Sequence, residues 1–134
     1  MFVTLALAVI NPQAGRLSVA SAGHPLPLVR DGTGRVMEVG RIGDKPLGLD
    51  EHADFTQHEY EIDSGDSVVF FTDGVVEALN KGNEMYGDQR LSETVQRAGG
   101  GAERLVETIA ADVKSFAAGH PQSDDVTVVC FERK

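Results

Sequence analysis

Residues 67–74 read SVVFFTDG, an uncharged stretch that ends at an aspartate and a glycine. Ser67–Phe71 is almost entirely apolar, which predicts a strand that is buried on both faces. Asp73 would then stand at the strand end, where a carboxylate is held rigidly enough to bind a metal ion, and Gly74 gives the backbone a freedom that other residues lack. The alternative is a turn in which Asp73 caps a short helix, which we expect over Val75–Asn80.

A second apolar stretch with acid at one end closes the chain and reads DDVTVVCF, residues 124–131. Val126–Phe131 is predicted to be a buried strand. Because successive residues of a strand face opposite sides, only one of Asp124 and Asp125 can face a site, and the other would support it or serve a different ion. The alternative is an Asx turn that leaves both charges in water.

The two acidic strand ends can form one site if the strands are neighbours. Asp73 and Asp124 would then converge, and converging carboxylates repel each other unless a cation lies between them. Oxygen ligands of this kind favour Mg²⁺ or Mn²⁺. The single cysteine and the four histidines share no metal-ligand spacing, so a zinc site is not expected.

The rest of the chain predicts antiparallel strands first and helices afterwards. Apolar or alternating stretches separated by Pro, Gly and Asn indicate strands over residues 2–10, 16–21, 26–30, 35–39 and 55–62, of which the first is expected to be buried. Helical spacing of apolar residues indicates helices over residues 89–98 and 102–118. This order is typical of an α+β fold, and 134 residues suffice for one domain.

The composition disfavours two kinds of partner. With 12 Lys and Arg against 21 Asp and Glu, the net charge is −9, which argues against binding to nucleic acid or to an anionic membrane surface. The apolar N-terminal stretch is shorter than the about 20 residues of a spanning helix, and no Lys or Arg precedes Arg16 as a signal peptide requires. A single cysteine, Cys130, agrees with a reducing, cytoplasmic location.

Several short motifs occur in a fixed order along the chain. They are FVTL (2–5), AGHPLPL (22–28), PLGL (46–49), GD (65–66), FTDGVVEA (71–78), YG (86–87) with RL (90–91), and DDVT (124–127). In this order the chain resembles the catalytic domain of metal-dependent (PPM-type) serine/threonine protein phosphatases. The resemblance is to the bacterial branch typified by the stage II sporulation protein E (SpoIIE) and the stress-response phosphatase RsbU.

The resemblance implies a β-sandwich flanked by helices, with two Mn²⁺ or Mg²⁺ ions at one end. It implies hydrolysis of phosphoserine or phosphothreonine by a metal-activated water. The substrate would be a regulatory protein, such as an anti-sigma-factor antagonist, and an upstream sensor or receiver domain would control the activity. Asp73 and Asp124 match metal ligands of the family. Gly74, Glu77 and Asp125 are weaker candidates, and for Glu77 the alternative is a favourable charge near a helix N-terminus.

The chain departs from the family pattern at its start. The family domain opens with a strand that ends in Gly-Asp-x-x-Asp and a long helix with Gly-His-Gly, and neither motif occurs here. Residues 1–134 therefore match the C-terminal two thirds of that domain, without its first strand and helix. A non-catalytic binding module, or an inactive fragment, is the alternative to an active phosphatase. We also expect weak metal binding by the isolated chain, self-association through exposed sheet edges, and a structural role for His24.

Overall fold

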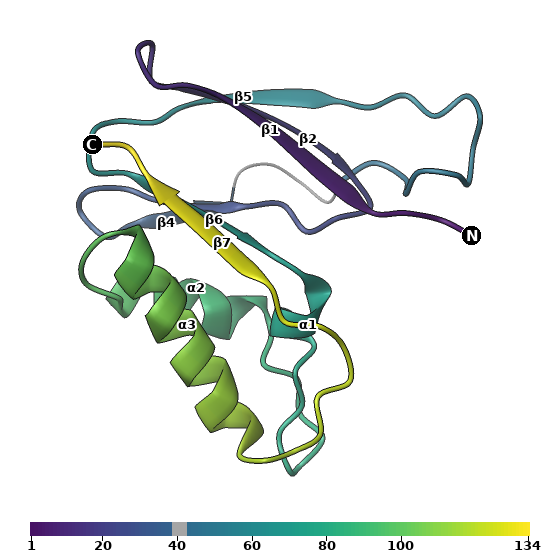
Figure 1. Ribbon diagram of the computed structural model, residues 1–134, viewed down its shortest axis with the longest axis vertical. Helices are drawn as coiled ribbons and strands as arrows, with labels where there is room; N and C mark the ends of the chain where they lie inside the picture. The colour runs from purple at the N-terminus through teal and green to yellow at the C-terminus, as the bar shows by residue number, and fades with distance from the viewer. Residues whose placement is uncertain (39–42) are drawn as a thin grey trace.

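The computed structural model of the protein describes residues 1–38 and 43–134 (Figure 1). In chain order its elements are β1 (Leu5–Asn11), β2 (Arg16–Ala22), β3 (Leu28–Arg30), β4 (Val36–Glu38), β5 (Gln57–Glu61), β6 (Ser67–Phe71), α1 (Asp73–Val76), α2 (Asp88–Arg97), α3 (Ala102–Ala117) and β7 (Val128–Glu132). The strand expected over residues 35–39 is observed as β4, while Val39 lies outside the described residues. None of the helices in the described ranges is long and apolar enough to cross a membrane.

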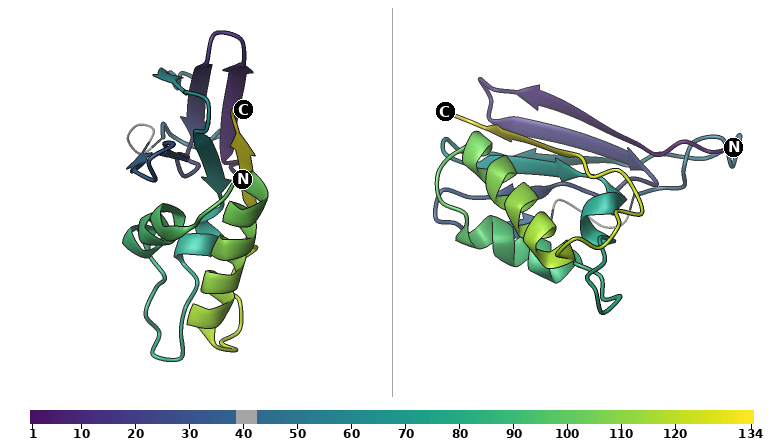
Figure 2. Two further views of the ribbon diagram at one scale, coloured as in Figure 1. Left: turned by 90° about the vertical axis from the view of Figure 1, so that its left-hand side faces the viewer. Right: turned by 60° about the horizontal axis from the view of Figure 1, so that its bottom comes forward.

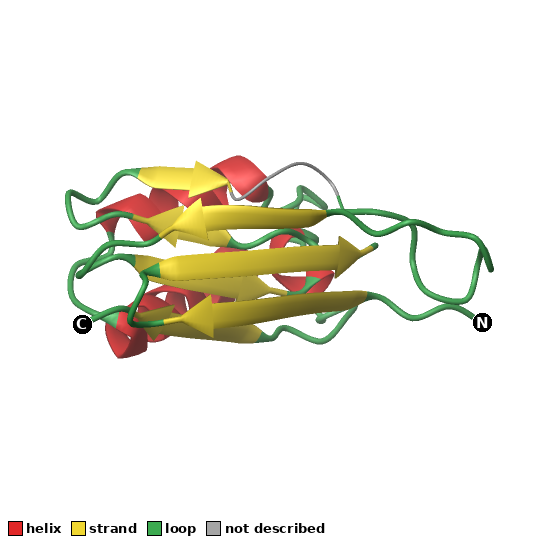
Figure 3. Ribbon diagram, turned by 90° about the horizontal axis from the view of Figure 1, so that it is seen from above, coloured by secondary structure: helices red, strands yellow, loops and turns green. Residues whose placement is uncertain are grey.

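The strands form two antiparallel sheets that stack face to face. One sheet has the order β1-β2-β5 and the other β4-β3-β6-β7. Helices α2 and α3 pack on the outer face of the four-stranded sheet (Figure 2). Over the outer face of the three-stranded sheet, the described part of the chain places no helix (Figure 3). The predicted α+β sandwich is confirmed, with its helical layer on one side.

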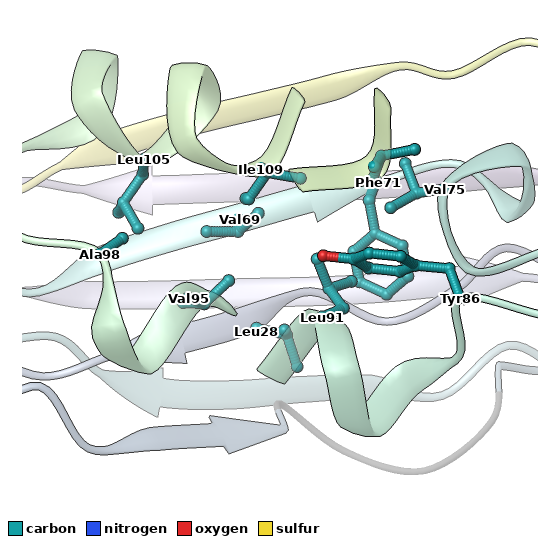
Figure 4. Packing of buried hydrophobic residues seen from close by; sticks show 11 residues of the cluster. Leu28, Val69, Phe71, Val75, Tyr86, Leu91, Val95, Ala98, Leu105 and Ile109 are labelled. Carbon is teal, nitrogen blue, oxygen red and sulfur yellow. The ribbon is translucent and has the colours of Figure 1, made fainter. Parts of the chain in front are cut away.

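The strand β6 contributes to two separate cores, because neighbouring side chains point to opposite faces. Val68 packs between the two sheets, in a cluster with Leu17, Val19, Val29 and Ile62. Val69 and Phe71 point the other way, into the core beneath the helices, which Figure 4 shows from close by. That second core also contains Leu28, Val75, Tyr86, Leu91, Val95, Ala98, Leu105, Ile109 and Val113. The prediction that Ser67–Phe71 is buried on both faces is confirmed.

The first and last strands are less buried than the sequence predicts. β1 is an edge of the three-stranded sheet, and Leu5, Leu7 and Val9 on its outer face are 47%, 58% and 61% exposed. β7 is an edge of the four-stranded sheet, and Val129 is 56% exposed. Apolar composition indicates that a segment is a strand, but the burial of that strand depends on whether a neighbour covers it. Both expectations of a buried strand are therefore wrong in part.

The short helix expected over Val75–Asn80 is also different. It begins at Asp73 and ends at Val76 after a single turn. Beyond α1 the backbone pairs with a later segment, since the carbonyls of Val76 and Ala78 accept hydrogen bonds from the N–H groups of Gly87 (2.9 Å) and Tyr86 (2.8 Å). The Asn80 side chain stabilises the turn between these segments, because its Oδ1 accepts hydrogen bonds from the backbone N–H groups of Gly82 (2.9 Å) and Glu84 (3.0 Å). Such a bond offers the backbone an alternative to the helix, and the chain turns back instead.

A buried carboxylate joins two turns at one end of the sandwich. Asp66, 8% exposed, accepts hydrogen bonds from the backbone N–H of Gly32 (3.0 Å) and of Asp63 (2.8 Å). Gly32 lies in the turn between β3 and β4, and Asp63 in the turn before β6. The Gly65-Asp66 motif is thus structural and fixes the start of β6.

The helical layer is held together by one carboxylate on α3. Asp112 accepts hydrogen bonds from Tyr86 Oη (2.7 Å), Thr94 Oγ1 (3.2 Å) and Arg90 Nε (3.3 Å), and it pairs with Arg97. Burial raises the pKa of Tyr86 to about 12, so the phenol keeps the proton that it donates. Burial also opposes ionisation of Asp112, but the hydrogen bonds and the nearby positive charge outweigh it and lower the pKa of this carboxyl.

We expect the substitution Asp112→Asn to lower the free energy of unfolding by about 1–3 kcal/mol, because it weakens several charge-assisted hydrogen bonds at once. Because the folded state depresses the pKa of Asp112 below its ordinary value of 3.8, its contribution is fully present above that pH. The contribution is lost as the pH falls through the lower, folded-state pKa. Denaturant unfolding from pH 7 to pH 2 should therefore show a shallower acid-side loss of stability in the variant.

The matched control is Glu107→Gln, which removes an exposed carboxylate from the same helix. Equal stability of Asp112→Asn and the unsubstituted protein at pH 7 would show that the network contributes nothing.

Candidate metal centre

The pairing of β6 with β7 brings the two acidic stretches together. The strands run antiparallel, with Phe71 opposite Val128. The C-terminal end of β6 therefore lies beside the start of β7, at one edge of the sheet. Asp73 follows the first strand directly, and Asp124 and Asp125 precede the second. The strands β6 and β7 are therefore neighbours, as the hypothesis of a shared acidic site required.

Thr72 extends this pairing beyond the ends of both strands. Its backbone N–H donates to the carbonyl of Thr127 (3.1 Å), and its Oγ1 accepts from the Thr127 N–H (2.9 Å). The same hydroxyl donates to the carbonyl of Asp125 (2.9 Å). A single side chain thus fixes the segment after β6 against the segment before β7. Sequence reasoning gave Thr72 no role, although a hydroxyl residue between a buried strand and an aspartate is suited to this bridging.

Gly74 is required by packing rather than by backbone conformation. It is buried within α1, and it is absent from the positive-φ glycines of the described residues. A Cβ at this position would lie 2.8 Å from the carbonyl carbon of Asp125 and 3.2 Å from the carbonyl oxygen of Asp124. The backbone freedom of glycine, which the sequence suggested as the reason for Gly74, is therefore not used here. A glycine is needed because a side chain at this position would push the two acidic segments apart.

The two predicted ligands, Asp73 and Asp124, are both exposed at this edge. Asp73 is the first residue of α1, and the residue that precedes the helix is Thr72, whose side chain makes no capping bond. The alternative that Asp73 caps the helix is therefore wrong. Asp124 Oδ1 accepts a hydrogen bond from the backbone N–H of the next residue, Asp125 (2.7 Å), whereas an Asx turn would require the N–H two residues on.

The weaker candidates lie around this pair. The backbone carbonyl of Asp125 accepts a hydrogen bond from Thr72 Oγ1 and lies close to Gly74, while Asp125 itself is exposed. Glu77 is exposed and directly follows α1, and its backbone N–H donates to the carbonyl of Asp73 (2.9 Å). It lies one helical turn beyond Asp73, as its spacing predicted, on the C-terminal side of the helix. The alternative of a favourable charge near a helix N-terminus therefore does not apply.

A cavity of about 320 Å³ opens beside Asp73. Its wall includes His24, whose Nδ1 is 2.9 Å from the carbonyl of Pro25. Ser21 Oγ donates to the carbonyl of His24 (2.6 Å) and fixes the bend after β2. Glu38 and Asp88 also line the cavity, and sequence reasoning missed both. They lie far apart in the chain, and no motif joins them, so only the fold could place them together.

The donor set fits a hard divalent cation but forms only part of a cage. Carboxylates and carbonyl oxygens at an exposed edge are ligands that Mg²⁺ and Mn²⁺ accept, with water in the remaining positions. Within residues 1–38 and 43–134, however, no three His, Cys, Asp or Glu side chains are grouped so that they could hold a metal ion. The structure thus places the segments that carry the two candidate ligands, Asp73 and Asp124, side by side.

Comparison with known sequences identifies relatives over the full chain. A sequence model of the family described as stage II sporulation protein E (SpoIIE) matches residues 1–134. Protein IcfG from Synechocystis sp. is 29% identical over 133 residues, which make up 99% of this chain and 21% of IcfG.

Solved structures share the fold. The PP2C domain of SiaA from Pseudomonas aeruginosa superposes with a TM-score of 0.81 at 19% identity, over 96% of this chain and 51% of that one. The phosphatase domain of SpoIIE from Bacillus subtilis gives 0.77 at 18% identity, over 98% and 58%. The same domain presoaked with Mn gives 0.75 at 19% identity, over 96% and 56%.

The chain spans about half the length of these solved domains and about a fifth of IcfG. The SpoIIE model nevertheless covers every residue, and the sandwich has the fold of the solved PP2C domains. The chain belongs to the SpoIIE family and has the fold of PPM-type phosphatase domains.

Proposed function

We propose that residues 1–134 form the C-terminal portion of a metal-dependent protein phosphatase domain that hydrolyses phosphoserine or phosphothreonine. The observation that supports the proposal is that the segments carrying Asp73 and Asp124 lie side by side at one sheet edge, through the β6–β7 pairing and the close approach of Gly74 to Asp125. Membership of the SpoIIE family supports the reaction class.

The roles of the residues follow from their positions. Asp73 and Asp124 would hold Mn²⁺ or Mg²⁺, and a bound cation of this kind lowers the pKa of a water molecule and neutralises charge on a phosphoryl group. Thr72 and Gly74 hold the backbone segments of the two aspartates against each other and would thereby position both carboxylates. Asp125 would support the centre through its backbone, and Glu77 would add negative charge one turn away.

The substrate and the setting are inferred from the family resemblance and from composition. The substrate would be a phosphorylated regulatory protein, such as an anti-sigma-factor antagonist, and a sensor or receiver domain in a longer protein would control the site. The net charge of −9 supports a protein rather than a nucleic-acid partner. The single cysteine supports a cytoplasmic location.

A second candidate function is a non-catalytic binding module. One observation favours it: the described residues hold no group of three candidate ligands. Such a module would keep the sandwich and its acidic edge for a partner without hydrolysing a phosphate ester.

The first test is a phosphatase assay with Mn²⁺ on the full-length gene product and on its Asp73→Asn and Asp124→Asn variants. Each substitution replaces a charged ligand by a neutral amide of the same size. We expect kcat/KM to fall at least about 100-fold in each case, since even groups that only orient ligands are worth 10–100-fold.

The control for this assay is Asp63→Asn, which removes an exposed carboxylate before the start of β6, at the opposite end of that strand. Retention of most of the activity in both ligand variants would refute the assigned roles. Absence of activity in the unsubstituted protein would favour the binding module.

The second test concerns metal binding by the 134-residue chain itself. Two carboxylates without a third, bridging ligand should bind Mn²⁺ weakly, with a dissociation constant on the order of micromolar or higher. Isothermal titration calorimetry measures this directly, and Asp73→Asn/Asp124→Asn provides the blank. Submicromolar affinity would mean that further ligands, not identified here, complete the site.

The third test concerns the partner of the 134-residue chain. We propose that it self-associates, because β1 is a seven-residue edge strand without a charge and its residues Leu7 and Val9 are exposed. Light scattering after size exclusion should show dimers or larger species at micromolar concentration. The variant Leu7→Lys/Val9→Lys places charge on that face and should shift the population to monomer. A stable monomer of the unsubstituted chain would contradict the proposal.

A further inference from the structure

The cavity beside Asp73 has an apolar wall and an acidic rim. Leu28, Phe71 and Leu91 line it and belong to the buried core between the sheet and α2 (Figure 4). Glu38, Asp73 and Asp88 line the same cavity, and all three acidic residues are exposed. The cavity is therefore hydrophobic in its depth and negatively charged where it meets solvent.

The rim carries no compensating cation within the described residues. Glu38 ends β4 and Asp88 begins α2, and neither makes an ion pair or a side-chain hydrogen bond to any residue of 1–38 or 43–134. Among residues 1–38 and 43–134, His24 is the only other titratable residue on the wall, and no lysine or arginine of these ranges lines the cavity. If a divalent cation binds at Asp73, Glu38 and Asp88 still leave the rim with two negative charges.

A long basic side chain matches both parts of this cavity. Lysine and arginine have aliphatic stems that pack on apolar surface while the charged head stays near water and near carboxylates. The volume of about 320 Å³ is sufficient for such a side chain. A purely apolar side chain would fill the depth but leave the two carboxylates unpaired, and an acidic one would be repelled.

We propose that this cavity binds a lysine or arginine side chain that flanks the phosphorylated residue of the substrate protein, and that Glu38 and Asp88 determine this specificity. The inference rests on the proposed phosphatase function, because the cavity shares Asp73 with the candidate metal centre. It adds the chemical class of substrate that the site selects.

The test uses phosphoserine peptides with lysine, norleucine or glutamate placed in turn at each position flanking the phosphoserine. Norleucine keeps the aliphatic stem and removes the charge, so it separates the apolar from the ionic contribution. With the full-length gene product and Mn²⁺, we expect one position at which lysine lowers KM about three- to tenfold relative to norleucine. Glutamate at that position should raise KM.

The variant Glu38→Gln/Asp88→Asn should abolish the difference between the lysine and norleucine peptides by raising KM for the lysine peptide alone. The control Glu103→Gln removes a carboxylate from the first turn of α3, as Asp88→Asn does from α2, but lies outside the cavity. It should keep the lysine preference. The reversal Glu38→Lys/Asp88→Lys should favour the glutamate peptide.

Binding of the same peptides, measured by fluorescence anisotropy with a chelator present, separates the two proposals. A lysine preference in this binding assay, together with no hydrolysis of any peptide in the Mn²⁺ assay, would support the cavity proposal and overturn the phosphatase function. Hydrolysis of all peptides with equal KM, or a lysine preference that survives Glu38→Gln/Asp88→Asn, would overturn the cavity proposal and leave the phosphatase function intact.

Discussion

The antiparallel pairing of β6 with β7 is the interaction on which the candidate site depends. It places the residue after one strand beside the residues before the other, although they are about fifty positions apart in the chain. Thr72 continues the pairing with three hydrogen bonds, and Gly74 allows α1 to lie directly against Asp124 and Asp125. Two carboxylates at the surface are thus supported by backbone that cannot move independently.

The rigidity of this edge comes from the double burial of β6. Val68 is fixed in the core between the sheets, while Val69 and Phe71 are fixed beneath the helices. A displacement of the strand would disturb both cores at once, and close-packed interiors resist such displacements. The strand that carries Asp73 is therefore the best supported in the fold, whereas β7, which follows Asp124, has a neighbour on one side only.

The sandwich is asymmetric in a way that bears on function. Helices cover the four-stranded sheet, but apolar side chains of β1 face solvent on the three-stranded sheet. The solved domains of the family extend over about twice the length of this chain. The acidic edge and the neighbouring cavity are nevertheless formed by residues present here, because β3, β6, α1 and α2 all belong to the covered side.

The sequence by itself determined the α+β class and nearly all of the elements, and it singled out the two aspartates that we propose as metal ligands, because periodicity and strand-end acids are local signals. It could not determine the burial of β1 and β7, which depends on neighbours that are distant in the chain. Nor could it identify the bridging by Thr72, the packing reason for Gly74, or the grouping of Glu38 and Asp88 around one cavity. These features are decided by the tertiary structure, because each is a contact between segments that only folding brings into van der Waals or hydrogen-bonding distance.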